Sequence, residues 1–295
     1  MIMEDYVGKN QRILDEWRAK FIQDKQTNKA YAGWSQKEIS AQFAEDGIMF
    51  KGAFDEDHPV YYNGSVGFRW IRKQTNNGLV ENQLWNAAPL RVLYLTKDQN
   101  TGDEKAWDVR SESFRYPDKR YKPQEMWLYT QNTFFRNLVY SLYGILNTKP
   151  NFKMEYNFTN QQALQCADDN IFARINCKKE VGYDRCLNNI LEDAINNDRD
   201  FLKRQITLLD ADIFVCCGYS KAIGESGNLM LNFLNTIGYN FKADKKESWI
   251  YYDEPNNKIA INSYHLSYPG FDYEGMINAY FEFLKAHPDF TNSHR

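Results

Sequence analysis

The chain has 295 residues, 36 basic and 39 acidic side chains, and a formal net charge of −3. This length suits one large domain or two modest ones, and the charge balance lacks the overall basic character typical of nucleic-acid-binding domains, although a local basic patch would suffice. No apolar stretch approaches the roughly 20 residues of a membrane-spanning helix, and the N-terminus lacks the apolar core of a signal peptide. We therefore expect a cytoplasmic protein.

The first 90 residues differ in pattern from the rest. An amphipathic helix is predicted from about Asn10 to Phe21, and a second helix begins at a capping box formed by Ser35 and Glu38. Residues 51–70 are polar and rich in glycine and aromatic side chains, with no clear period. We expect residues 1–90 to form a helical and irregular extension packed on a core domain of residues 91–295.

From Arg91 onward, apolar runs alternate with segments of helical period. The run 248–253 reads as an edge strand, and Asp272 is the expected N-cap of the last helix. Strands are predicted at 91–95, 171–176, 211–218, 248–253 and 258–264, and helices at 124–146, 184–209, 226–237 and 272–287.

Apolar strands separated by helices predict an α/β fold. We expect a three-layer α/β/α arrangement with a mainly parallel central sheet of about four strands. Ligands of such sheets bind at the carboxyl ends of the strands. Three polar loops therefore stand out, namely those that follow the strands ending near 95, 176 and 264.

Each of these loops carries one side chain with useful chemistry. Asp98 is able to orient water or stabilise a cation, Asn176 offers a donor and an acceptor to a flat heterocycle, and His265 is a hydrogen-bond donor or general acid. Taken alone, Asp98 and Asn176 read more readily as turn residues, and a single loop histidine is more often structural or merely exposed. Together at the ends of parallel strands, they predict a shared cleft for a reaction at a nitrogen heterocycle.

Motifs of other chemistries are missing from the sequence. There is no P-loop, no G-x-G-x-x-G after a strand, no G-x-S-x-G and no H-E-x-x-H. The five cysteines include no C-x-x-C pair, and the adjacent Cys216 and Cys217 lie in an apolar run typical of core packing. We expect neither a cofactor nor a metal ion.

The order and content of the strand-end loops resemble the uracil-DNA glycosylase superfamily. That family carries a first loop like G-Q-D-P-Y, a second strand ending in Asn, a third like V-F-L-L-W-G, and a fourth ending in H-P-S-P. The stretches here that resemble them are VLYLTKDQN (92–100), ARINCKK (173–179), DIFVCCGYSKA (212–222) and NSYHLSYPG (262–270). The resemblance covers about residues 91–287.

The resemblance implies roles for individual residues. Asp98 matches the carboxylate that handles the attacking water, Asn176 the amide that reads the base, and His265 the histidine that steadies the base oxygen as the glycosidic bond breaks. Ser267 matches a contact to backbone phosphate. Phe114 is the candidate for the ring that stacks on the flipped base, with Trp107 and Tyr116 as rivals.

Several positions depart from the family pattern. Gln99 and Asn100 stand where the family has Pro and Tyr, and Leu266 and Tyr268 replace both prolines of H-P-S-P. Pro269 lies where the family inserts an apolar wedge.

A local basic rim is the expected contact to DNA, with a solvated charged loop as the equally open alternative. We expect Lys178 and Lys179 to bind phosphate beside it. The rim residues are Arg110, Arg115, Lys119, Arg120 and Lys122.

The leading interpretation is a monofunctional DNA glycosylase that hydrolyses the N-glycosidic bond of a flipped, uracil-type base in DNA. A second is a non-catalytic module that binds nucleic acid or nucleotides and has kept the fold. A third is an interaction protein whose first 90 residues form the docking surface. The sequence identifies no protein partner.

Overall fold

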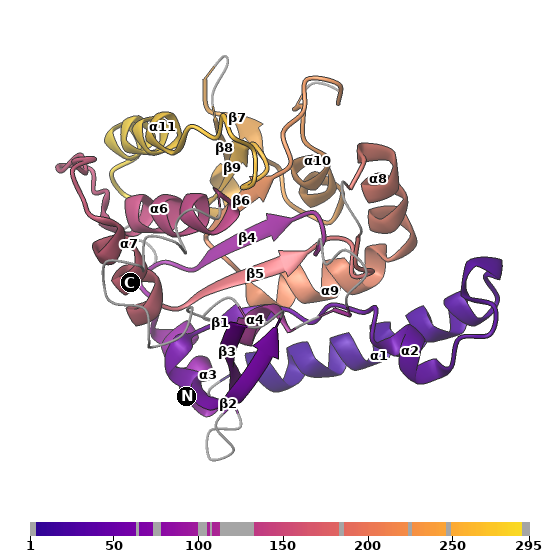
Figure 1. Cartoon of the computed structure of the whole chain (residues 1–295). Coiled ribbons are helices and arrows are strands. Elements are labelled where there is room, and N and C mark those ends of the chain that lie inside the picture. Colours follow the sequence, from indigo (N-terminus) through magenta and orange to yellow (C-terminus); the bar gives the residue numbers. More distant parts are fainter. Residues whose placement is uncertain are drawn as a thin grey trace.

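The computed structural model of the chain describes residues 4–62, 65–72, 78–99, 105–106, 108–112, 133–182, 186–223, 226–245 and 249–290. Figure 1 shows the arrangement of the elements. The helices are α1 (Tyr6–Gln26), α2 (Gln36–Ser40), α3 (Leu79–Ala87), α4 (Val109–Glu112), α6 (Thr133–Asn147), α7 (Asn160–Asp169), α8 (Asn188–Asn197), α9 (Arg199–Leu209), α10 (Leu229–Thr236) and α11 (Tyr273–Ala286). The strands are β1 (Gly47–Met49), β2 (Phe54–Tyr62), β3 (Ser65–Arg72), β4 (Val92–Thr96), β5 (Phe172–Asn176), β6 (Ile213–Cys217), β7 (Lys242–Ala243), β8 (Ile250–Asp253) and β9 (Lys258–Ser263).

The main sheet has seven strands in the order β1-β5-β4-β6-β9-β8-β7. Its centre, β5-β4-β6-β9, is parallel, which confirms the predicted mixed α/β fold with a mainly parallel sheet. The expected count of about four strands covers only this centre, because β1 joins β5 and the pair β8 and β7 joins β9, all antiparallel. Within the predicted edge strand 248–253, residues 250–253 form β8, but the edge of the sheet belongs to β7.

Both faces of the parallel centre are buried. Every residue of β4, β5 and β6 is buried, as expected for parallel strands covered on both sides. Val92 and Tyr94 pack in one apolar cluster with α6, α7 and α11, whereas Leu93 and Leu95 pack in another with α1, α8, α9 and α10. Figure 1 shows α6 and α11 on one side of β4 and β5, and α1 and α9 on the other.

The N-terminal segment contributes directly to this sheet. Helix α1 begins before and ends after the predicted range 10–21. The capping box of Ser35 and Glu38 at α2 is confirmed. Strand β1 pairs with β5, with Gly47 opposite Arg174 and Met49 opposite Phe172. A division of the chain at residue 90 therefore separates two hydrogen-bonded strands of one sheet.

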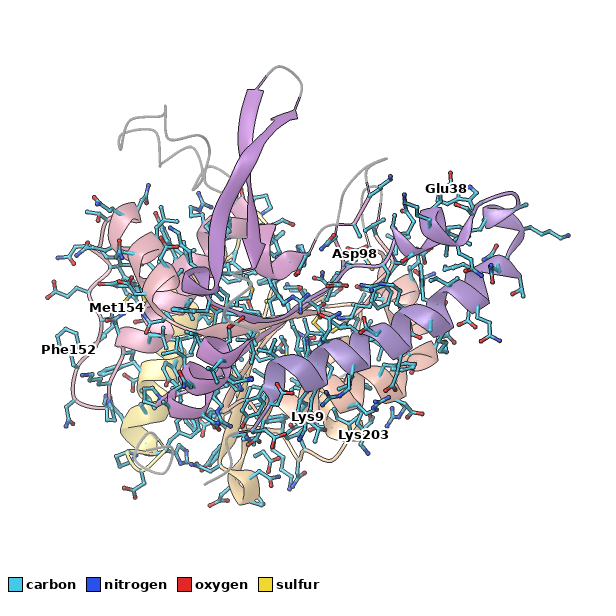
Figure 2. The ribbon with its side chains drawn as sticks, turned by 90° about the horizontal axis from the view of Figure 1, so that it is seen from below. Lys9, Glu38, Asp98, Phe152, Met154 and Lys203 are labelled. Atoms are coloured by element: carbon cyan, nitrogen blue, oxygen red, sulfur yellow. The ribbon has the colours of Figure 1, made fainter. Side chains whose placement is uncertain are left out.

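The expectation of irregular structure at 51–70 is wrong. Strands β2 and β3 form an antiparallel hairpin that is separate from the main sheet and projects from the body of the molecule (Figure 2). The register shifts between Asp57 and Pro59, which interrupts the two-residue alternation that would have marked a strand.

The predicted helix 184–209 is two helices. α8 ends and α9 begins at Asp198, whose φ of −113° and ψ of 20° lie outside the helical range. The last helix, α11, begins after the expected N-cap Asp272. Among the described residues, no helix combines the length and apolar character needed to cross a membrane.

Candidate functional site

Three of the predicted site residues lie at one edge of the sheet. Asn176 is the last residue of β5, Asp98 lies two residues beyond β4, and His265 lies two residues beyond β9. Because these strands are parallel, their carboxyl ends share an edge. β5 and β4 are neighbours, and β9 is separated from β4 by β6.

Asn176 is fully buried and only partly satisfied. Its Oδ1 accepts hydrogen bonds from Thr96 Oγ1 at 2.6 Å and from Arg174 Nη2 at 3.3 Å. Its Nδ2 has no hydrogen-bond partner in the part of the chain that the structure describes. A buried donor left unpaired costs about 1–3 kcal/mol, so the amide is suited to a ligand that brings an acceptor.

His265 is held as a neutral donor. Both the hydroxyl of Ser267, at 2.7 Å, and its backbone N–H, at 3.3 Å, approach Nδ1. A backbone N–H requires an acceptor, so the imidazole proton lies on Nε2. Burial, with the charges of Lys97 and Arg174, lowers the pKa of His265 to about 4.

Arg174 and Phe134 connect Asn176 to His265. The guanidinium of Arg174 lies 4.4 Å from the centre of the Phe134 ring, and that ring lies 5.7 Å from the imidazole of His265. Phe134 is in the first turn of α6, and Asn137 one turn later donates to the carbonyl of Leu266 at 2.7 Å. The start of α6 therefore fixes the His265 loop on the face of the sheet that carries Asn176.

Sequence reasoning missed Thr96, Arg174 and Phe134 as parts of this site. Arg174 offered a signal, since it is the single charged residue in the buried run of β5. Thr96 and Phe134 have no distinguishing pattern in the sequence.

Asp98 has a different immediate partner. The backbone pairing of β4 with β5 continues into the segments that follow these strands, where the N–H of Lys178 donates to the carbonyl of Lys97 at 2.8 Å. The Asp98 carboxylate lies 3.4 Å from Lys178 Nζ. Burial raises the pKa of Asp98, and Lys178 acts against this shift. Among the described residues, no hydrogen bond or ion pair joins Asp98 to Asn176 or His265.

Gly182 makes room for this carboxylate. A Cβ at position 182 would lie 2.5 Å from Asp98 Oδ2, and the backbone N–H of Gly182 donates to the carbonyl of Gln99 at 2.7 Å. Contact this close excludes any larger residue without a shift of the carboxylate. The loop after β5 is thus shaped around Asp98.

The two lysines predicted to bind phosphate, Lys178 and Lys179, are both buried. Lys178 is 8% exposed and donates to the carbonyl of Glu180 as well as to Asp98. Lys179 is 2% exposed, pairs with Asp46 and lies over the Trp17 ring at 4.8 Å. The expected phosphate contact of Lys179 is wrong, because its ammonium faces the protein interior.

Ser267 is exposed, but its hydroxyl contacts His265. Of the basic rim, Arg110 is 5% exposed and is bound by Asp108 and Glu45. This buried, paired arginine does not form a rim. The other predicted rim residues and the candidate stacking rings lie outside the described residues: Arg115, Lys119, Arg120, Lys122, Trp107, Phe114 and Tyr116.

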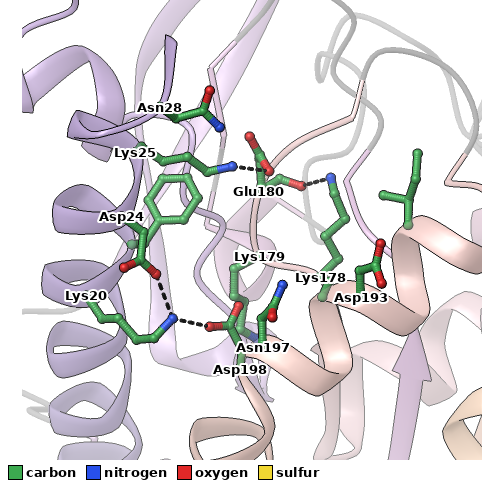
Figure 3. A pocket seen from close by; sticks show the side chains of 13 residues that line it. Lys20, Asp24, Lys25, Asn28, Lys178, Lys179, Glu180, Asp193, Asn197 and Asp198 are labelled. Carbon is green, nitrogen blue, oxygen red and sulfur yellow. Dashed lines mark hydrogen bonds and ion pairs between the residues drawn. The ribbon is translucent and has the colours of Figure 1, made fainter. Parts of the chain in front are cut away.

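A separate pocket of about 490 Å³ lies between α1 and α8 (Figure 3). Lys20 pairs there with Asp24 and Asp198, and Lys25 pairs with Glu180. These opposite charges largely neutralise one another, so the pocket offers no strong field to a charged ligand. In the described part of the chain, no group of three or more His, Cys, Asp or Glu residues is arranged to hold a metal ion.

The comparisons with known proteins leave the family of the chain open. No family model, no curated protein and no solved structure matches the sequence or the fold.

Proposed function

We propose that the protein is a divergent DNA glycosylase that hydrolyses the N-glycosidic bond of a base turned out of DNA. The observation that carries the proposal is the buried Asn176 amide, whose Nδ2 has no partner among the described residues and lies on the same face of the sheet as the neutral donor His265. A flat heterocycle with exocyclic oxygens matches two such donors. Extruding a base costs a few kcal/mol, and a pocket that pairs with its edge offsets this cost.

His265 suits the leaving base. Cleavage of the glycosidic bond leaves negative charge on the base, and a neutral Nε2–H donates to that charge without giving up its proton. The positive charges of Lys97 and Arg174, which help to lower the pKa of His265, also stabilise an anion at this position. The environment therefore favours the departure of an anionic base.

Asp98 acts on the sugar side in this proposal. An ionised carboxylate orients the attacking water and stabilises the oxocarbenium-like sugar. Lys178 favours the ionised form against the effect of burial. The two apolar clusters on opposite faces of the sheet support the three-layer α/β/α arrangement expected from the alternation of strands and helices.

The test uses purified protein and oligonucleotides, single- and double-stranded, that carry uracil and other modified bases. We expect an abasic product with at least one substrate, and about a hundredfold or greater loss in Asp98→Asn and His265→Ala. Lys285→Ala, on an exposed face of α11, is the matched control and leaves the rate unchanged. Absence of product from every substrate, under conditions in which a reference glycosylase works, would refute the proposed glycosylase activity.

One observation favours the second candidate, a binding module without catalysis. The Asp98 carboxylate already has Lys178 as a partner, and a carboxylate held in an ion pair is less able to orient water. In that case oligonucleotide binding survives Asp98→Asn unchanged and the wild type releases no base. Binding without turnover distinguishes this candidate from the glycosylase.

A further inference from the structure

Four aromatic side chains form a group at the edge of the sheet where the candidate site lies. They are Tyr219, Trp249, Tyr264 and Tyr268, called the aromatic platform below. Tyr264 is at the centre, stacked on Tyr268 at 4.8 Å, with Tyr219 at 5.0 Å and Trp249 at 6.4 Å, both edge-on. Such pairs hold one another in place, so the platform is ordered before any ligand arrives.

The backbone ties the platform to the strand ends. Tyr219 follows β6, and its N–H donates to the carbonyl of Ser263, the last residue of β9, at 2.8 Å. Trp249 precedes β8, and its carbonyl accepts from the N–H of Asn262 at 2.7 Å. Tyr264 is the residue directly before His265. All four rings therefore belong to the loops that surround the candidate site.

Core packing does not account for Tyr268. The side chain is 47% exposed, whereas Leu266 in the same loop is fully buried. Trp249 and Tyr264 pack against the apolar cluster below them, whereas Tyr268 does not belong to it. Among the described residues, the hydroxyl of Tyr268 has no hydrogen-bond partner, so polar contacts do not explain its position. An exposed, pre-ordered ring beside a polar site is typical of a surface that stacks a ligand.

Tyr268 lies one turn from His265. The N–H of Tyr268 donates to the carbonyl of His265 at 2.8 Å, which closes a turn whose ends are within about 7 Å of each other. A base held under His265 therefore has its neighbouring nucleotide within reach of the Tyr268 ring. Lys221, exposed in the loop after Tyr219, adds positive charge for the connecting phosphates.

We propose that the aromatic platform stacks an unpaired base next to the target base, and that the substrate is single-stranded DNA. This inference rests on the proposed function. In a duplex the neighbouring base is paired and stacked in its own helix, so it is not free to lie on Tyr268. In a single strand every base has an open face, and base–aromatic stacking tolerates any sequence.

The test is fluorescence anisotropy with a labelled oligothymidylate, alone and annealed to its complement. We expect the wild type to prefer the single strand. Tyr268→Ala weakens that binding by about five- to a hundredfold, the range for losing one base–aromatic stack, while Tyr268→Phe and Tyr268→Trp keep it. Phe152→Ala is the matched control, since Phe152 is 56% exposed and lies across the molecule from Asp98 (Figure 2).

Equal binding of oligothymidylate by the wild type and Tyr268→Ala would overturn the inference, and so would a preference for duplex. A platform that serves a protein partner instead would give the first of these results. The outcome is independent of base release. Excision of bases from duplex DNA without a role for Tyr268 would refute only the proposed role of the aromatic platform. Binding of single strands through Tyr268 without excision would refute only the proposed glycosylase activity.

Discussion

The carboxylate of Asp46 accepts the backbone N–H of Asn176 at 2.8 Å, and this bond joins the N-terminal segment to the residue proposed to read the base. The same carboxylate pairs with Lys179 and accepts from Gln205 at 2.8 Å, and all three side chains are buried. Asn10 of α1 donates to the backbone carbonyl of Asp46 at 2.8 Å. The first 50 residues thus hold the end of β5 in position.

Removing one member of the buried pair Asp46–Lys179 is expected to destabilise the fold. Asp46→Asn and Lys179→Met each leave an uncompensated buried charge and lower the free energy of unfolding by about 3–5 kcal/mol. The double variant costs less than the sum, because it leaves no charge behind. Urea unfolding measures all three.

The exposed pair Glu16–Arg204 supplies the control, and Glu16→Gln leaves the free energy of unfolding unchanged because water screens the pair. Additive costs for the two buried substitutions would show that the ion pair does not couple them.

Sequence reasoning located the strands that matter because they are short apolar runs buried on both faces. The runs at 91–95, 171–176, 211–218 and 258–264 became β4, β5, β6 and β9. The side chains at their ends followed from the geometry of parallel sheets.

The sequence did not reveal how distant segments meet. Strand β1 is only three residues long, and nothing local distinguishes it from a loop. The dipeptide Asn63-Gly64, a strong hairpin signal, and the alternation of Val66, Phe68 and Trp70 were available in the sequence, whereas β2 has a register shift near Asp57 and no such alternation. The burial of Lys179 depends on Asp46, 133 positions away, and no short pattern encodes such a pair.

His265 is expected to make stability depend on pH. Its pKa is about 4 in the fold, against an ordinary value of 6.5, so between these values the unfolded chain takes up a proton that the folded chain does not. The stability contribution is complete above pH 6.5 and is lost as the pH falls toward 4. We expect the free energy of unfolding to fall more steeply over this range in the wild type than in His265→Asn.

Comparing the two proteins cancels the contributions of the other histidines. Parallel curves in urea unfolding at pH 7 and pH 4.5 would mean that His265 titrates alike in both states.

Lys178→Met is expected to move the acid limb of the base-release profile to higher pH. Burial already raises the pKa of Asp98, and Lys178 is the main opposing influence. Without that cation the pKa rises further, so a smaller fraction of Asp98 is ionised at any given acidic pH. Single-turnover rates across the pH range measure the limb. Lys25→Met is the control, because Lys25 pairs with Glu180 rather than Asp98. An unshifted limb would show that Asp98 does not control it.

Gly182→Ala tests whether the position of the Asp98 carboxylate matters. The added Cβ would lie 2.5 Å from Asp98 Oδ2, so the carboxylate must move. A displacement of about 1 Å in a catalytic group costs about a hundredfold in rate, and we expect a loss of this size in base release. Gly218→Ala, after β6, is the matched control, since its nearest atom, Met230 Cε, is 3.3 Å away and belongs to a flexible side chain. Urea unfolding of both variants separates misplacement from unfolding. If the Gly182→Ala protein stays folded and releases base at the wild-type rate, Asp98 does not take part in the reaction.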